Sequence, residues 1–133
     1  MESIKTALIV IDETETVGKI AEAVSAALKG YQTLIRPAEA FAGTDLLPAH
    51  VFFLGCGKPE PETFGLVGRM LEHINLAGRP CGVFSADSKA LKYLSALVKD
   101  SGAAAGEPLL VKDGAPVQSE IKKWTQDILK QKP

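Results

Sequence analysis

The sequence predicts a three-layer α/β/α domain in which helices cover both faces of a five-stranded parallel sheet. Short apolar runs alternate with amphipathic stretches along the chain, in the order strand and then helix. The apolar runs are continuous and rich in Val, Ile, Leu and Phe, which is typical of strands buried on both faces. Strands that alternate with helices are joined by parallel crossovers, so helices are expected on both sides of the sheet.

Five apolar runs are predicted strands, and four amphipathic stretches are predicted helices. In the first helical stretch, Ile20 and Val24 lie four positions apart on one face. Gly30 follows where a left-handed helix cap is expected. Pro37 ends the second strand, which leads into a segment that can hold at most a short helix over 38–42. The predicted strands are 6–11, 31–35, 50–55, 80–85 and 108–112, and the predicted helices are 15–29, 62–74, 88–101 and 117–130.

The composition is that of an ordinary globular protein, and we expect residues 1–133 to form one domain. Of 133 residues, 46% are apolar and 23% charged, and the net charge is -1. This balance argues against a nucleic-acid partner, because such proteins carry clustered Lys and Arg. No apolar run approaches a membrane span, and the N-terminus does not resemble a signal peptide. Two cysteines without metal-type spacing favour a cytoplasmic location and no metal site.

Any ligand site is expected at the carboxyl edge of the sheet, where the strands end. Four loops build this edge, and we restrict the candidate site to them. Neither histidine has a partner pattern that would make it catalytic, so no catalytic residue is predicted. The four loops are 12–17, 36–49, 56–62 and 85–88.

The first loop precedes a helix N-terminus, where free backbone N–H groups and the helix dipole favour an anion. It supplies its own negative charge, since Asp12, Glu13 and Glu15 lie within four positions. One interpretation is that Thr14 or Thr16 caps the helix. The alternative is that their hydroxyls hold a phosphate. Charge argues against the alternative, because a carboxylate ~4 Å from a phosphate charge costs ~1 kcal/mol in water and ~4 kcal/mol at an effective dielectric near 20.

The third loop places Cys56 between Gly55 and Gly57. Two interpretations of this cysteine stay open. It is either a reactive thiol whose pKa is lowered by Lys58, or a small inert filler. A disulfide between Cys56 and Cys81 is not expected, because they lie toward opposite ends of neighbouring parallel strands.

The fourth loop is very short. Ser85, Ala86 and Asp87 lead directly into a helix, with Asp87 or Ser88 as its predicted cap.

Over nearly its whole length the sequence resembles the flavodoxin family. The resemblance implies the strand order 2-1-3-4-5, an FMN site at the strand ends, and electron transfer to a redox partner. The segments that carry it are ALIVIDETETVGKIAEAVSAAL, HVFFLGCGKPEPETFGLVGRMLEHINLAGRPCGVFSA and GEPLLVKDGAP. The residues it places at the cofactor are Thr14, Glu15, Thr16, Gly55, Cys56, Gly57, Ser85, Ala86 and Asp87.

The sequence departs from the family pattern at the phosphate loop, which resembles S/T-x-T-G-x-T. Thr14 and Thr16 keep hydroxyls, but the glycine is missing and the loop is one residue short. The third and fourth loops hold no aromatic residue to flank a flavin ring. Phe64 has the helical spacing of a core residue, and Phe41 is a weaker candidate. We therefore expect FMN binding to be weak or lost, which leaves an FMN electron carrier or an FMN-free module that binds a redox or regulatory protein.

A second resemblance is to response-regulator receiver domains, which share this architecture. Asp12 and Glu13 match their acidic metal pocket, and Ser85 matches their switch hydroxyl. Lys112 matches their lysine, but a Gly-Cys pair that begins at Gly55 stands where the phosphoacceptor carboxylate should end the third strand. Without that carboxylate, aspartyl-phosphate chemistry has no nucleophile, so this resemblance implies an inactive pseudo-receiver.

Overall fold

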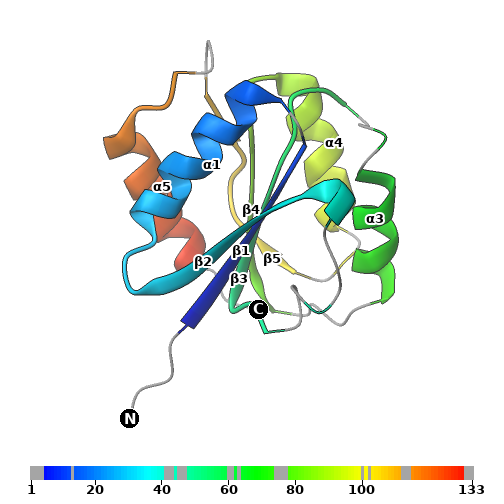
Figure 1. Cartoon of the computed structure of the whole chain (residues 1–133), viewed down its shortest axis with the longest axis horizontal. Coiled ribbons are helices and arrows are strands. Elements are labelled where there is room, and N and C mark those ends of the chain that lie inside the picture. The colour runs from blue at the N-terminus through cyan, green and yellow to red at the C-terminus, as the bar shows by residue number, and fades with distance from the viewer. Residues whose placement is uncertain are drawn as a thin grey trace.

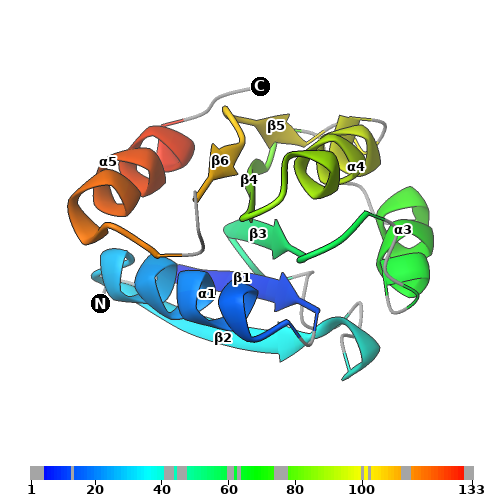
Figure 2. The same ribbon diagram turned by 90° about the horizontal axis from the view of Figure 1, so that it is seen from above.

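The strands form one parallel sheet that has helices on both faces (Figures 1 and 2). The strand order is β2-β1-β3-β4-β5, and a sixth strand, β6, pairs with β4. The strands are β1 (Lys5–Ile11), β2 (Tyr31–Pro37), β3 (Val51–Gly55), β4 (Pro80–Ser85), β5 (Ala104–Ala105) and β6 (Leu109–Leu110). This computed structural model describes residues 5–12, 14–40, 44, 48–59, 62, 64–73, 78–99, 101, 103–111 and 115–130.

The helices cover the sheet in two pairs. Helices α1 (Glu15–Ala27) and α5 (Gln118–Leu129) lie on one face (Figure 2). Helices α3 (Phe64–His73) and α4 (Ser88–Lys99) lie on the other. The three-layer architecture and the strand order are thereby confirmed. None of the described helices is long and apolar enough to cross a membrane.

The core consists of two apolar layers, one on each side of the sheet. Successive residues of a strand point to opposite faces, so one continuous apolar run supplies both layers. In β1, Leu8 packs with Phe64 on the α3 and α4 side, whereas Ile9 packs with Val24 on the α1 and α5 side. This alternation explains why the strands read as unbroken apolar runs.

The predicted turn residues behave as expected around β2. Gly30 has a φ of 85°, which is the left-handed conformation that follows the end of α1. Pro37 is the last residue of β2. The short helix expected over 38–42 is a 3-10 turn, η1 (Ala38–Ala40), and Phe41 lies outside the described residues.

The single strand predicted over 108–112 is wrong in extent, because two short strands occupy this edge. β5 pairs with the start of β4 and β6 pairs with its end. Between them the chain leaves the ladder: the Trp124 indole N–H donates to the Glu107 carbonyl at 2.7 Å. Pro108, which comes next, has no N–H to give to a ladder. The interruption therefore follows from one long-range hydrogen bond and one proline.

Candidate functional site at the carboxyl edge of the sheet

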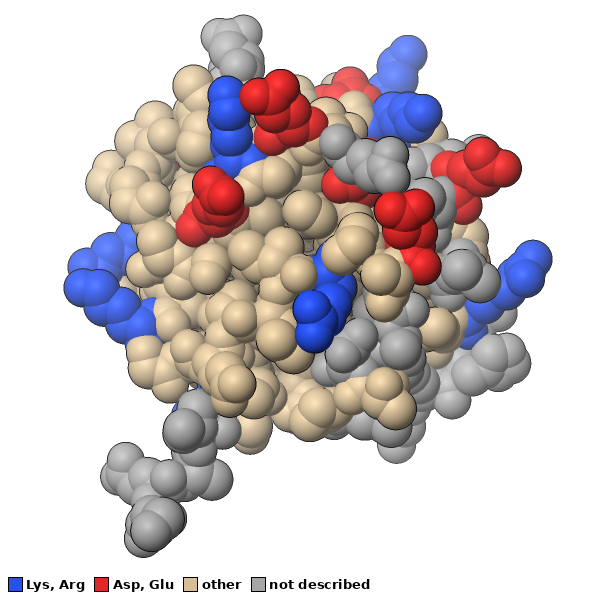
Figure 3. Space-filling view, in the orientation of Figure 1, with Lys and Arg blue, Asp and Glu red and all other residues tan. Residues whose placement is uncertain are grey.

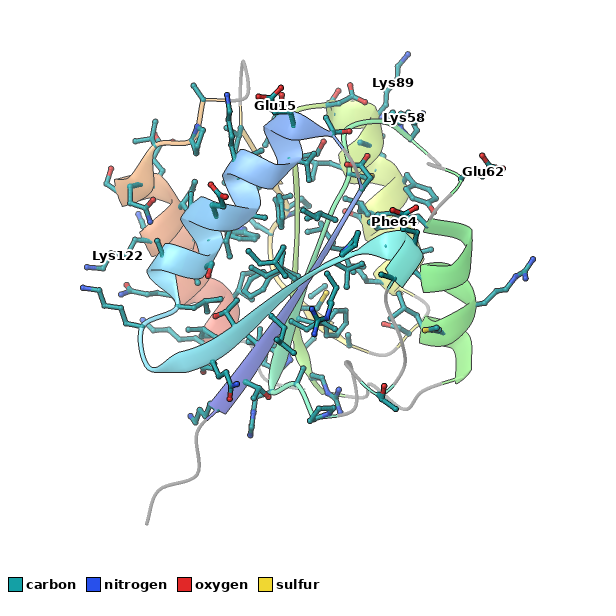
Figure 4. All side chains as sticks on the ribbon, in the orientation of Figure 1. Glu15, Lys58, Glu62, Phe64, Lys89 and Lys122 are labelled. Atoms are coloured by element: carbon teal, nitrogen blue, oxygen red, sulfur yellow. The ribbon has the colours of Figure 1, made fainter. Side chains whose placement is uncertain are left out.

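The loops after β1, β3 and β4 meet at the carboxyl edge of the sheet, as predicted. Glu15, Lys58 and Lys89 mark this end of the molecule in Figure 4, whereas Lys122 lies away from it on α5. In the loop after β2, residues 41–43 and 45–47 lie outside the described residues. The site is therefore described here from three loops.

Asp12 joins the first loop to the third. One carboxylate oxygen, Oδ1, accepts the backbone N–H of Thr14 at 3.1 Å, and the other, Oδ2, accepts the N–H of Gly57 at 2.8 Å. The N–H of Asp12 itself donates to the Gly55 carbonyl at 3.2 Å. With 7% of its surface exposed, Asp12 is a buried carboxylate whose two oxygens both hold backbone donors.

Thr14 packs directly on Gly57. A Cβ added to Gly57 would lie 2.5 Å from Thr14 Oγ1, so the two loops touch at this point without a gap. Thr14 is the N-cap residue of α1, yet its side chain makes no capping hydrogen bond. The predicted cap position at Thr14 is therefore confirmed, but the expected capping hydrogen bond from its side chain is absent. Thr16 lies inside the first turn, after Glu15, and the Asp12 carboxylate accepts the Thr14 N–H instead.

Ser85 joins the third loop to the fourth. Its buried hydroxyl donates to the Cys56 carbonyl at 2.6 Å and accepts the Asp87 N–H at 3.0 Å. Asp87 Oδ2 in turn accepts the N–H of Ala90 at 3.1 Å, so the predicted Asp87 cap of α4 is confirmed. Ala86 is half-buried between the two. Hydrogen bonds thus connect all three loops at the carboxyl edge of the sheet.

Cys56 is fully buried at the end of β3. Burial, the largest cause, and the negative charges of Asp12 and Asp87 raise the pKa of its thiol to about 12. The exposed Lys58 opposes this increase only through its backbone N–H. Of the two interpretations, the inert filler is the one that the structure supports. Cys56 and Cys81 are both free and buried, so no disulfide joins them, as expected.

Cys56 is expected to resist thiol reagents in the folded protein. A thiol pKa raised from 9.0 to about 12 lowers the thiolate fraction at neutral pH, so reaction should be roughly a thousandfold slower than for an exposed thiol. A chromogenic disulfide reagent should detect little thiol in the native state and both cysteines in denaturant. Fast native labelling that disappears in Cys56→Ala would contradict the burial.

The same raised pKa makes stability depend on alkaline pH. Between pH 9 and about 12 the unfolded chain releases the Cys56 proton while the folded chain keeps it. The free energy of unfolding should therefore fall as the pH rises through this window. Urea unfolding of the wild type and Cys56→Ala across the window isolates the effect, and the wild type should have the steeper decline.

The charges on the visible face are mixed. Figure 3 shows acidic and basic groups next to one another toward the carboxyl edge, and below them a largely uncharged area with a basic side chain near its centre. The described charges on this face therefore form no single-sign field that would attract a phosphate dianion. Among the described residues, no three His, Cys, Asp or Glu side chains gather as a metal site would require. Glu13 and Lys112, matched to a receiver pocket, lie outside those residues.

A groove lies between β6 and the start of α5, and the sequence did not predict it. It has a volume of about 330 Å³, and its described lining includes the carboxylate of Glu120. Leu110 and Val117, which line it, are 41% and 51% exposed, the largest exposures of big apolar side chains in the described part of the chain. The remaining lining residues are Leu109, Val111, Ala115 and Ile121.

Known structures resemble this arrangement over nearly the whole chain. The flavodoxin of Streptococcus pneumonia TIGR4 has a TM-score of 0.75 at 18% identity, covering 95% of each chain. A short-chain flavodoxin associated with a non-canonical PDU bacterial microcompartment has a TM-score of 0.81 at 16% identity, covering 95% of this chain and 97% of that one. The chain has the flavodoxin-like fold.

The other comparisons with known proteins give a weaker structural match or none. A CheY-like receiver domain from Methanospirillum hungatei JF-1 matches at a TM-score of 0.55 and 19% identity, covering 96% of this chain and 94% of that one. No family model and no curated protein matches the sequence. The flavodoxin structures therefore resemble the chain more closely than the receiver does, and at such identities the likeness concerns the fold.

Proposed function

We propose that this flavodoxin-like chain binds FMN weakly or not at all and acts through contacts with a redox or regulatory protein. The observation that carries the proposal is the direct contact between the first and third loops. The Thr14 side chain packs on Gly57, and the Gly57 N–H is already bound to Asp12 at 2.8 Å. An FMN phosphate docking at this loop would have to separate two loops that are hydrogen-bonded and in van der Waals contact.

The electrostatics of the first loop support the same proposal. A phosphate at the start of α1 would lie near the buried Asp12 carboxylate and the exposed Glu15. One such neighbour costs about 4 kcal/mol at an effective dielectric near 20, which weakens binding roughly a thousandfold. Fewer free backbone N–H groups are available to offset this cost, because those of Thr14 and Gly57 already donate to Asp12.

The expected flavin-ring position also lacks aromatic groups in the described loops. Residues 55–59 and 85–88 include none. Phe64, the nearest candidate, is the first residue of α3, has no exposed surface and packs in the core. A ring that stacks on a flavin needs an accessible face. The described residues therefore offer neither a free phosphate cradle nor a stacking platform.

The second candidate function is FMN-dependent electron transfer. It is favoured by the likeness to flavodoxins over nearly the whole chain. An inactive pseudo-receiver has less support, since its structural match is weaker and Gly55 and Cys56 are buried where an acceptor carboxylate would be required.

FMN titration tests the proposal. The purified protein should be colourless, and added FMN should keep its fluorescence until well above the micromolar range. Trp124 is the one tryptophan of the chain, so its emission gives a second readout, because bound flavin would quench it by energy transfer. A Glu13→Ser/Glu15→Gly variant should bind FMN better if charge is the obstacle. Stoichiometric, tight FMN retention by the wild type would overturn the proposal and favour the electron carrier.

A further inference from the structure

We propose that the Asp12 carboxylate serves as a built-in anion, binding the backbone N–H groups at the start of α1 and in the loop after β3 that a phosphate would otherwise use. It thereby holds the two loops together without a ligand. This inference rests on the proposed function and deepens it, because it names the group that occupies the anion position. The ligand class that would replace it is a small oxyanion.

The geometry at Asp12 is that of a bound anion. Each carboxylate oxygen accepts one backbone N–H, from Thr14 at 3.1 Å and from Gly57 at 2.8 Å. The two donors are far apart in sequence, so the carboxylate joins two separate loops rather than capping one turn. Hydrogen bonds to an ionised acceptor are about twice as strong as neutral ones. The Asp12 side chain is itself buried, and the lower local dielectric strengthens both hydrogen bonds.

The local backbone is built to present these donors. Thr14 is the N-cap residue of α1, its side chain makes no capping hydrogen bond, and its backbone N–H donates to the Asp12 carboxylate. Gly57 lies so close to Thr14 that a Cβ would collide with Thr14 Oγ1 at 2.5 Å. Any larger residue at this position would require the Thr14 side chain to move.

Removing this carboxylate should therefore leave a vacancy that a free carboxylate can fill. Asp12→Gly deletes the acceptor but keeps both backbone donors and the space of the side chain. Formate has the same two oxygens in the same geometry and is the smallest probe of that vacancy. Inorganic phosphate, the second probe, asks whether the vacancy also admits the head group of a nucleotide.

The experiment measures thermal unfolding of Asp12→Gly in sodium formate, with sodium chloride holding the ionic strength constant. Losing two charge-assisted hydrogen bonds should lower the melting temperature by about 6–10 °C. Formate should recover several degrees of this loss in a saturable way, because a ligand that binds only the folded state stabilises it. The wild type should not respond beyond the chloride baseline. In the variant, amide NMR signals of Thr14 and Gly57 should move with formate.

Two matched variants separate the proposal from general charge effects. Glu15→Gln removes an exposed carboxylate from the same loop and should neither melt early nor respond to formate. Asp12→Asn fills the same space, but its amide directs an N–H toward one of the two donors. This variant should be less stable than the wild type, and formate should not raise its melting temperature, because the Asn side chain fills the space that formate would occupy. Rescue of Asp12→Asn equal to that of Asp12→Gly would overturn the inference.

A measurement on the wild type covers the case in which Asp12→Gly does not fold. NMR coupling across the hydrogen bond between Gly57 N and the Asp12 side-chain carboxyl carbon should be detectable, and the Gly57 amide should exchange slowly with solvent. Absence of both would overturn the inference. If Asp12→Gly folds and does not bind FMN, but formate does not raise its melting temperature, only the inference is overturned. Tight FMN binding by the wild type would overturn the proposed function itself.

Discussion

Gly55→Ala is expected to destabilise the fold by about 3 kcal/mol, at the upper end for an overpacked core. A Cβ at Gly55 would lie 2.6 Å from Cζ of Phe84 on the neighbouring strand. The Phe84 ring has no exposed surface and packs edge-on against Trp124, with ring centroids 6.4 Å apart, so it cannot swing away. Urea unfolding followed by far-UV circular dichroism measures the loss.

Two further variants identify the cause of the Gly55→Ala effect. Gly18→Ala in α1 adds the same methyl group where no atom lies within 4 Å. It should raise stability by up to about 1 kcal/mol, because alanine favours the helix. Gly55→Ala combined with Phe84→Leu should cost less than the sum of the two single changes, since the smaller side chain relieves the collision. An unchanged urea midpoint for Gly55→Ala would contradict the packing of β3 against β4.

Phe64→Ala is expected to cost about 3–5 kcal/mol of folding free energy. Phe64 begins α3, and its ring is fully buried with Leu8 and Leu54 from the strands below. Truncation to alanine removes the ring's transfer free energy and leaves a cavity that the surrounding core fills only in part. The free energy of unfolding from urea titration gives the magnitude, and Phe64→Leu should lose clearly less.

The same pair of variants tests the alternative role of Phe64. If Phe64 were a flavin-stacking residue, Phe64→Leu would change FMN affinity while leaving stability nearly untouched. The buried position predicts the reverse, with a stability loss and no change in the FMN titration. A stable Phe64→Leu with altered FMN response would show that the ring is accessible in solution.

Local patterns predicted most of the architecture. Helices α1, α3, α4 and α5 begin and end within two or three residues of the predicted limits. The amphipathic spacing of Phe64 identified it as core before any contact was known, and the structure confirms it. These features depend on residues close in sequence, because side-chain period and turn chemistry are local properties.

The candidate site could be predicted only in part. The carboxyl edge and its loops follow from the strand–helix alternation alone. The sequence also placed three carboxylates in the first loop, but it did not predict that one of them binds the third loop. The Asp12 carboxylate is buried and accepts the backbone N–H of Gly57, a contact that no spacing within the first loop predicts.

What the sequence by itself determined is the set of strands and helices, their parallel connections and the acidic nature of the first loop. Only the tertiary structure decided that the Asp12 carboxylate accepts the Gly57 N–H and that the Ser85 hydroxyl donates to the Cys56 carbonyl. It also decided that β5 and β6 are separate strands and that Leu110 and Val117 share one groove. Each of these depends on groups brought together from distant parts of the chain, and such contacts exist only once the sheet has formed.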